Sequence, residues 1–406
     1  MIKSRYKKVT LKEIVSDMHQ GINTAADKVD YASSGIPIIQ SRNFTSGVLD
    51  LDETKFIGIE DEKKYGEKYK PRKGDVLFSN IGTVGKSVVI EVEKDFLFAW
   101  NVFLIRPKSA HLYSRYLQNY LNYLLGINFY ERWFTGGTVK FLNKKTIAEF
   151  EIPLPPLAEQ QRIAAILDAA DSLRQKDQQL VERYTTLSQS LFLEMFGDPV
   201  TNPMEWEINE LEKLVKNDRS ITYGILKPEE NHDDGVIMLR IQDIKGSRVS
   251  LNKVHKVSQE LSRQYKRTIL EGNEIVISLV GTIGLTAKIP PELAQSNVHR
   301  NLGVIALNKE KIQTDFFFQY TLLGSFQTLI KKMTTGGNQP LLNLGALNTL
   351  GVIVPPLTLQ NQFAERIQLI EAQKQQAQAS LEKSEALFNS LLQRAFTGEL
   401  TAKMAA

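Results

Sequence analysis

The tripeptide Pro155-Pro156-Leu157 recurs 200 residues later as Pro355-Pro356-Leu357, and each copy separates a short apolar stretch from a long segment without Gly or Pro. The apolar stretches are residues 151–154 and 351–354, whose composition is typical of a strand. Proline cannot continue inside a sheet but is favoured in the first turn of a helix. Each copy therefore predicts a strand that ends, followed at once by a helix.

The two segments after the prolines predict long helices. Neither Gly nor Pro interrupts residues 158–196 or 358–396. Apolar residues recur in alternating steps of three and four, which predicts a seam of coiled-coil type. The predicted seam residues are Ile163, Ile166, Ala170, Leu173, Leu180, Tyr184, Leu187 and Leu191 in the first helix, and Phe363, Ile367, Ile370, Ala377, Leu381, Leu387, Phe388 and Leu391 in the second.

Two polar residues interrupt these seams, Asp177 in the first helix and Lys374 in the second. If the helices pair antiparallel, the two positions come within about one turn of each other. A buried or half-buried polar contact between them would fix the register of the pair. The alternative is that each side chain reaches out to solvent, and the sequence leaves both open.

The repeat extends over the whole chain in one order, with matching segments offset by 199 or 200 residues, which independent chance matches would not keep. Each copy is domain-sized, and we call the part before each proline pair a reader. The matches, in order along the chain, are Gly35–Ile39 with Gly235–Leu239, Asp75–Gly85 with Glu274–Gly284, Asn101 with Asn301, Thr135–Gly137 with Thr335–Gly337, Leu142-Asn143 with Leu342-Asn343, and Ser190-Leu191 with Ser390-Leu391.

Each reader predicts a mixture of short strands and few helices. Apolar runs such as residues 36–40, 76–78 and 102–105 are separated by Gly, Pro and Asn. Helices are expected near residues 114–125 and 316–330.

We therefore expect an α+β fold with two similar mixed α/β readers joined by two long helices. The helices would form an antiparallel coiled coil with pseudo-twofold symmetry. The expected boundaries are 1–155 for the first reader, 156–198 for the first helix, 199–355 for the second reader, 356–397 for the second helix and 398–406 for a C-terminal tail.

Composition excludes several classes of site. Cysteine is absent, which excludes disulfides, thiolate metal sites and cysteine nucleophiles. The five histidines are scattered without metal-ligand spacing, so we expect no metal site. No apolar run is long enough for a membrane span, and no leader segment is recognisable. We expect a soluble cytoplasmic protein without a membrane partner, whose net charge of +4 permits a polyanion ligand without requiring one.

No catalytic motif is complete. The segment Gly82-Thr83-Val84-Gly85-Lys86-Ser87 resembles a phosphate-binding P-loop, but Asn80 stands where its first glycine is needed and a strand is expected after it. The glycines can either let backbone amides approach a DNA phosphate or form a plain β-turn. Residues 154–157 lack the polar and aromatic residues of an adenine methyltransferase loop. We therefore expect no catalytic residue on this chain.

The order of reader, PLPPL-x-EQ-x-x-I helix, reader and helix resembles the specificity subunits of Type I restriction–modification systems. The residues that carry the resemblance are Ile152 to Ile163, Ser190 to Asp198, and the paired Ser-x-x-Gly-Thr-x-Gly loops. It covers essentially the whole chain. The second copy departs from the helix motif, because residues 359–363 read Leu-Gln-Asn-Gln-Phe, which leaves open whether both helices make identical contacts.

The resemblance implies a function and a set of partners. Each reader would be a target recognition domain for one half of a split double-stranded DNA site, and the helices would set the spacing. Two modification subunits would dock on the helices, and restriction subunits would join that core. S-adenosylmethionine, ATP and Mg would be bound by those partner subunits, and this chain would bind no cofactor of its own.

Candidate DNA contacts are polar residues in or beside turns, where phosphates and base edges can be reached. Each of them can equally be an ordinary solvated loop residue. A stand-alone enzyme and a scaffold that does not bind DNA are the competing functions. The candidates are Arg42, Asn43, Ser79, Asn80, Lys86, Arg132, Lys140 and Lys144 in the first reader, and Arg240, Gln242, Ser278, Arg300, Lys331, Asn338 and Gln339 in the second.

Overall fold

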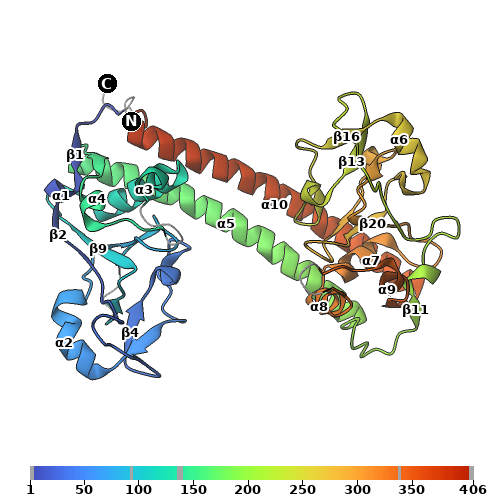
Figure 1. Ribbon diagram of the computed structural model, residues 1–406, viewed down its shortest axis with the longest axis horizontal. Helices are drawn as coiled ribbons and strands as arrows, with labels where there is room; N and C mark the ends of the chain where they lie inside the picture. The colour runs from blue at the N-terminus through green and yellow to red at the C-terminus, as the bar shows by residue number, and fades with distance from the viewer. Residues whose placement is uncertain (1–3, 92–94, 135–139, 337–339, 402–406) are drawn as a thin grey trace. The chain divides into compact units, whose positions relative to one another are not determined.

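The computed structural model describes residues 4–91, 95–134, 140–336 and 340–401 (Figure 1). The chain divides into two compact units, of which the first contains Met1–Asp177 and Ser380–Ala406 and the second contains Gln178–Ala379. The two long helices, α5 (Leu157–Phe196) and α10 (Leu357–Thr397), each contribute one half to each unit.

The first unit contains two four-stranded sheets. The inner sheet has the antiparallel order β2-β9-β6-β7, with strands β2 (Val15–Gln20), β6 (Val76–Ser79), β7 (Ser87–Val89) and β9 (Val102–Pro107). The outer sheet has the order β3-β5-β4-β8, with strands β3 (Tyr31–Ala32), β4 (Ile36–Ile39), β5 (Lys55–Ile57) and β8 (Leu97–Phe98). Strands β4 and β8 run parallel, as expected for strands joined by a long connection.

The core of the first unit lies between the inner sheet and helix α3 (Ser114–Gly126), which confirms the helix expected at 114–125. Tyr116 and Tyr120 of α3 pack with Ile163 of α5 and Phe396 of α10. The long helices therefore form part of the reader's core. The remaining elements of this unit are β1 (Lys8–Thr10), α1 (Leu11–Ile14), α2 (Ile59–Tyr69), α4 (Lys144–Ala148) and β10 (Glu151–Pro153).

The second unit repeats this plan. Its inner sheet has the order β12-β20-β17-β18, with strands β12 (Thr222–Tyr223), β17 (Ile275–Ser278), β18 (Thr286–Lys288) and β20 (Leu302–Ile305). Its outer sheet has the order β16-β13-β19, with strands β13 (Val236–Leu239), β16 (His255–Val257) and β19 (Asn297–Val298). The other elements are β11 (Ile208–Glu210), β14 (Ile244–Lys245), β15 (Arg248–Val249), α6 (Gln259–Gln264), α7 (Thr314–Thr321), α8 (Gly324–Lys332), α9 (Leu344–Asn348) and β21 (Gly351–Ile353).

The single helix predicted near 316–330 is wrong, because the structure has α7 and α8 with a break between them. Leu323 is buried in an extended conformation at the break. The side chain of Gln327 donates a hydrogen bond to the Thr321 carbonyl (2.8 Å), which the break releases from the helical ladder. The burial of Leu323 and the hydrogen bond to the Thr321 carbonyl thus offset the helical hydrogen bonds that are lost at the break.

The long helices pack antiparallel within the first unit. Ile163 and Leu167 near the start of α5 share a core with Phe396 near the end of α10. Further along α5, the guanidinium carbon of Arg174 lies 5.7 Å from the ring centre of Phe388. Residues further along α5 therefore contact residues earlier in α10, as in an antiparallel pair. Among the described residues, neither these nor any other helix is long and apolar enough to span a membrane.

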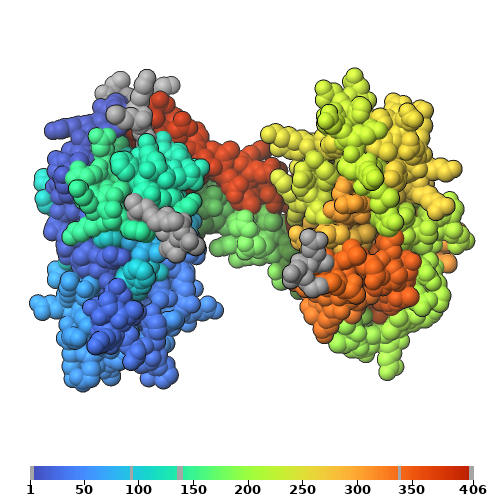
Figure 2. Space-filling model, in the orientation of Figure 1, coloured from blue at the N-terminus to red at the C-terminus, as the bar shows by residue number. Residues whose placement is uncertain are grey.

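The predicted seam is wrong in the middle of α5 and at Leu387 of α10, which is 46% exposed. Leu173, Leu180 and Leu187 were expected inside, but they are 46%, 40% and 49% exposed. The buried positions there are Asp177 and Ser188, separated by eleven residues. Eleven residues make nearly three whole turns of a straight α-helix, whereas steps of seven drift away from the contact face. Figure 2 shows solvent-facing surface along both long helices.

The two polar seam residues differ in their described contacts. Asp177 is buried, and its Oδ2 has no hydrogen-bond partner among the described residues. The Nζ of Lys374 lies 3.8 Å from the Oε1 of Glu371, one turn earlier on α10. A direct contact between Asp177 and Lys374 stays a prediction.

A buried glutamine fixes the start of each long helix. The Nε2 of Gln160 donates to the carbonyls of Pro155 (2.9 Å) and His111 (2.8 Å), and its Oε1 accepts from the Tyr113 amide (2.9 Å). Gln360 repeats this with Pro355 and Gln313 in the second unit. The glutamine shared by the two proline motifs therefore joins the helix start to the chain just before α3 or α7.

We expect Gln160→Leu to lower the free energy of unfolding of the first unit by about 2–4 kcal/mol. It removes the hydrogen-bond partner of the Tyr113 amide and of the His111 and Pro155 carbonyls, and each of these part-buried or buried groups costs roughly 1 kcal/mol when left unpaired. Urea denaturation of the full chain measures the effect. Gln161→Leu, at an exposed neighbouring position, is the matched control and should change stability by less than about 0.5 kcal/mol. Equal effects of the two variants would contradict this assignment.

We expect Phe196→Ala to destabilise the second unit by about 3–5 kcal/mol. Phe196 is fully buried, and its ring centre lies 4.8 Å from that of Phe316 and 5.3 Å from that of Phe363. Leu187→Ala on the same helix is the control and should be nearly neutral, because Leu187 is half exposed. Thermal and urea unfolding check both values, and a large loss for Leu187→Ala would restore the original seam.

Candidate nucleic-acid interface

Strands β2, β4, β6 and β8 of the first unit end on the side where β9 begins, and five connecting segments meet there. The register places Gln20 of β2 and Ser79 of β6 beside the start of β9, while β8 enters the same turn from the outer sheet. We call this side the loop edge. In the first reader it consists of residues 20–22, 40–43, 79–86, 99–101 and 140–142.

Backbone hydrogen bonds hold these segments together. The amide of Trp100 donates to the Ile22 carbonyl (2.8 Å), which joins the turn at 99–101 to the end of β2. The amide of Asn80 donates to the Asn101 carbonyl (3.3 Å), and the Asn80 carbonyl accepts from Leu142 (2.9 Å). Because backbone atoms make these bonds, they do not require particular side chains at positions 80, 100 and 142.

The second unit has the same frame. The amide of Arg300 donates to the Ile225 carbonyl (3.0 Å), the amide of Leu279 donates to Asn301 (2.8 Å), and Leu342 donates to Leu279 (2.9 Å). Its loop edge consists of residues 223–225, 240–243, 278–285, 299–301 and 341–342.

A glycine permits the close crossing at each loop edge. A Cβ on Gly21 would lie 2.3 Å from the Phe98 carbonyl oxygen, and one on Gly224 would lie 1.8 Å from that of Val298. Both distances are far below van der Waals contact. Any side chain at either position would therefore push the outer sheet away from the inner one.

The glycine loops are turns whose first glycine faces open space. Gly82 and Gly281 have φ angles of +77° and +75°, and a Cβ on either would meet nothing within 4 Å. The Ser79 hydroxyl stabilises the first turn by donating to the Thr83 carbonyl and accepting from the Lys86 amide (2.9 Å). The loops are therefore firmly held and approachable by another backbone.

Four of the candidate DNA contacts are buried and serve the frame, so we reassign them as positioning residues. Ser79 and Ser278 hold the two glycine loops. Asn80 donates from Nδ2 to the Leu142 carbonyl (3.3 Å), and Asn43 accepts from the Gln40 amide (3.0 Å) at Oδ1. These four side chains are too buried to contact a DNA groove.

The other first-reader candidates are wholly or partly exposed. Arg42, Lys86 and Lys140 lie in loop-edge segments, and the Lys140 ammonium stands 5.3 Å from the Phe134 ring centre. Arg132 stacks on Phe129 at 4.0 Å, and Lys144 begins α4, so both lie just beside the edge.

In the second reader, Arg240, Gln242 and Arg300 lie in loop-edge segments. Arg240 is fixed by Asp243, with Nε–Oδ2 and Nη2–Oδ1 distances of 3.2 Å. Lys331, near the end of α8, lies outside these segments. The candidates Asn338 and Gln339 lie outside the described residues.

Sequence reasoning missed Trp100, which is 44% exposed at the turn between β8 and β9. The repeat register could have found it, because Asn101 aligns with Asn301 and the preceding positions are Trp100 and Arg300. Tyr31 was also missed. The ammonium of Lys55 lies 3.9 Å from the centre of its exposed ring, and its hydroxyl oxygen accepts a hydrogen bond from Gln40 Nε2 (3.1 Å).

His299, in the second loop edge, lies near basic side chains. The pKa of His299 is lowered by partial burial and by the charges of Arg300, Arg240 and His255. His299 is therefore neutral at neutral pH. Its Nδ1 accepts from the Asn301 amide (3.3 Å), so the ring proton is on Nε2.

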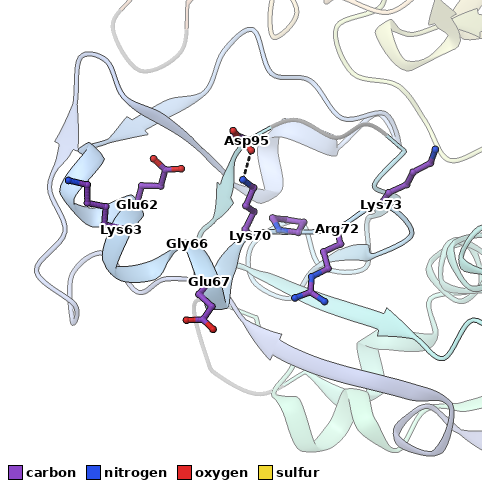
Figure 3. Close-up of a pocket in the computed structure, with 9 residues that line it drawn as sticks. Glu62, Lys63, Gly66, Glu67, Lys70, Arg72, Lys73 and Asp95 are labelled. Atoms are coloured by element: carbon purple, nitrogen blue, oxygen red, sulfur yellow. Dashed lines mark ion pairs between the residues drawn. The ribbon is translucent and has the colours of Figure 1, made fainter.

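A pocket of about 780 Å³ lies elsewhere in the first reader, along α2 and the segment that follows it (Figure 3). It is lined by Lys70, Arg72 and Lys73, and Lys70 pairs with Asp95. None of its lining residues belongs to a loop-edge segment, so it is not part of the loop edge. Within the described residues, no group of His, Asp and Glu could hold a metal ion.

The family model and the similar curated proteins all point to one family. The model of the Type I restriction modification DNA specificity domain matches residues 3–183 and again 203–383. The specificity subunit of the Type I restriction enzyme EcoBI from Escherichia coli is 27% identical over 66% of this chain, and the chain spans 62% of that relative's length. The putative MjaX specificity subunit from Methanocaldococcus jannaschii is 25% identical, with 97% of this chain and 93% of that protein covered.

Solved structures share the fold. The S subunit of a Type I restriction–modification system from M. genitalium superposes with a TM-score of 0.56 at 16% identity, covering 97% of this chain and 96% of that one. The family model matches the sequence twice, and the fold resembles that of a solved S subunit, so sequence and fold indicate the same family. The chain belongs to the family of Type I restriction–modification specificity subunits and carries two copies of the DNA specificity domain.

Proposed function

We propose that this chain is the DNA-recognition subunit of a Type I restriction–modification complex, in which each loop edge binds one half of a split double-stranded site. The observation that carries the proposal is the pair of loop edges. The backbone bonds made by Trp100, Asn80 and Leu142 recur at Arg300, Leu279 and Leu342, whereas exposed side chains differ, as with Trp100 and Arg300. Two equivalent backbone frames that present different exposed side chains are suited to recognising two different DNA half-sites.

We infer the same domain division that the repeat suggests. The target recognition domains are 1–155 and 199–355, the spacer helices are 156–198 and 356–397, and the tail is 398–406. The spacer helices set the distance between half-sites.

The spacer helices also dock two modification subunits. The exposed leucines of α5 support this, because Leu173, Leu180 and Leu187 recur every seven residues on the solvent side. Such a stripe fits the apolar face of a partner helix.

The chain acts without a catalytic residue of its own. S-adenosylmethionine is assigned to the modification subunits, and ATP with Mg to the restriction subunits. Recognition by this chain then decides where those subunits act.

DNA binding should weaken steeply with salt, because each phosphate contact by a lysine releases counterions. We expect Lys86→Ala and Lys140→Ala each to reduce the slope of log affinity against log salt by about one. Fluorescence anisotropy of the full chain on a labelled mixed-sequence duplex measures it. Lys63→Ala, on exposed α2 away from the loop edge, is the control. A chain that binds no DNA in complex with its modification subunits would instead be a scaffold.

A further inference from the structure

Positions 100 and 300 occupy the same place in the two frames. Each follows a short outer-sheet strand, and its amide donates to the equivalent carbonyl, Ile22 in one reader and Ile225 in the other. Both side chains are exposed. The two readers thus present a tryptophan and an arginine from one and the same point of the fold.

The Arg300 side chain is uncommitted. Among the described hydrogen bonds and ion pairs, none uses its guanidinium, although other arginines of the second unit are fixed by acids. Arg219 pairs with Glu274 (2.7 Å), and Arg240 pairs with Asp243. The backbone of Arg300 is therefore held by a hydrogen bond, while its planar guanidinium, with five N–H donors, makes none of the described hydrogen bonds or ion pairs.

The groups around Arg300 are also donors. His299 carries its ring proton on Nε2, because Nδ1 accepts from the Asn301 amide. Arg240 is oriented by Asp243 and by the Lys253 carbonyl (3.1 Å). The His299 amide donates to the Leu239 carbonyl (2.8 Å), which places His299 and Arg300 beside Arg240 at one corner of the loop edge. Partial burial and the nearby charges of Arg300 and Arg240 lower the pKa of His299, in agreement with this placement.

Of the four bases, guanine offers two acceptors side by side in the major groove, N7 and O6, and arginine binds them bidentately. Cytosine presents an amino donor there, which a corner made of donors disfavours. Given the proposed function, we propose that Arg300 specifies a guanine in the half-site read by the second reader, with His299 and Arg240 as its neighbouring donors.

The first reader lacks this chemistry at the same point. Trp100 offers one N–H and a large apolar ring, and the preceding residue is Ala99 in place of His299. Tryptophan cannot bind N7 and O6 together. The two half-sites therefore differ at equivalent positions, and the requirement for this guanine belongs to one half only.

The test compares methylation motifs. The full chain is expressed with its modification subunits, and genomic methylation is mapped for wild type, Arg300→Ala and Arg300→Lys. We expect Arg300→Ala to relax one guanine in one half of the motif and to leave the other half unchanged. Binding of the purified complexes to duplexes carrying each base pair at that position should show discrimination reduced about tenfold or more. Arg300→Lys should retain charge but lose much of the discrimination, because an ammonium lacks the fork.

Arg263→Ala is the matched control, since Arg263 is an exposed arginine of the same reader on α6, and its motif should equal that of wild type. Unchanged thermal unfolding of Arg300→Ala confirms an intact fold. The inference is overturned if Arg300→Ala keeps the full motif, relaxes both halves, or relaxes a base pair without guanine. If the wild-type complex itself shows no split motif and no sequence preference, the proposed function fails instead.

Discussion

The close crossing of chain at Gly21 and Gly224 is the constraint on which each reader depends. At this point the carbonyl of an outer-sheet residue approaches so closely that no side chain fits. The crossing brings the ends of the two sheets together and lets one turn, at 99–101 or 299–301, bond to both. Without it the five segments of a loop edge would lie on two separate surfaces.

Much of the fold could be predicted, because its signals are long or repeated. The proline pairs and uninterrupted segments predicted helices over 156–198 and 356–397, and α5 and α10 agree with these bounds to within two residues at each end. The seam failed at Leu173, Leu180 and Leu187, since a period of seven and a period of eleven compete in a helix that also has small buried residues. Periodicity alone does not tell which stripe faces the protein.

The site was harder to predict than the fold. Sequence reasoning selected Ser79 and Asn80 because polar residues beside glycine usually lie in exposed turns, yet both are buried in the frame. It missed Trp100 because an aromatic residue beside an apolar run looks like core. Only the tertiary hydrogen bonds separate residues that build the edge from residues that the edge presents.

The frame explains how the two copies can diverge without loss of stability. Asn80 and Leu279 have different side chains, but both donate an amide to the turn and accept from the same following segment. Exchanging one of these side chains for the other leaves the backbone hydrogen bonds of the frame in place. Exposed positions such as 100 and 300 are freer still, since their side chains leave the frame at a point fixed by the amide alone. A fold held in this way can exchange its recognition chemistry while its core stays constant.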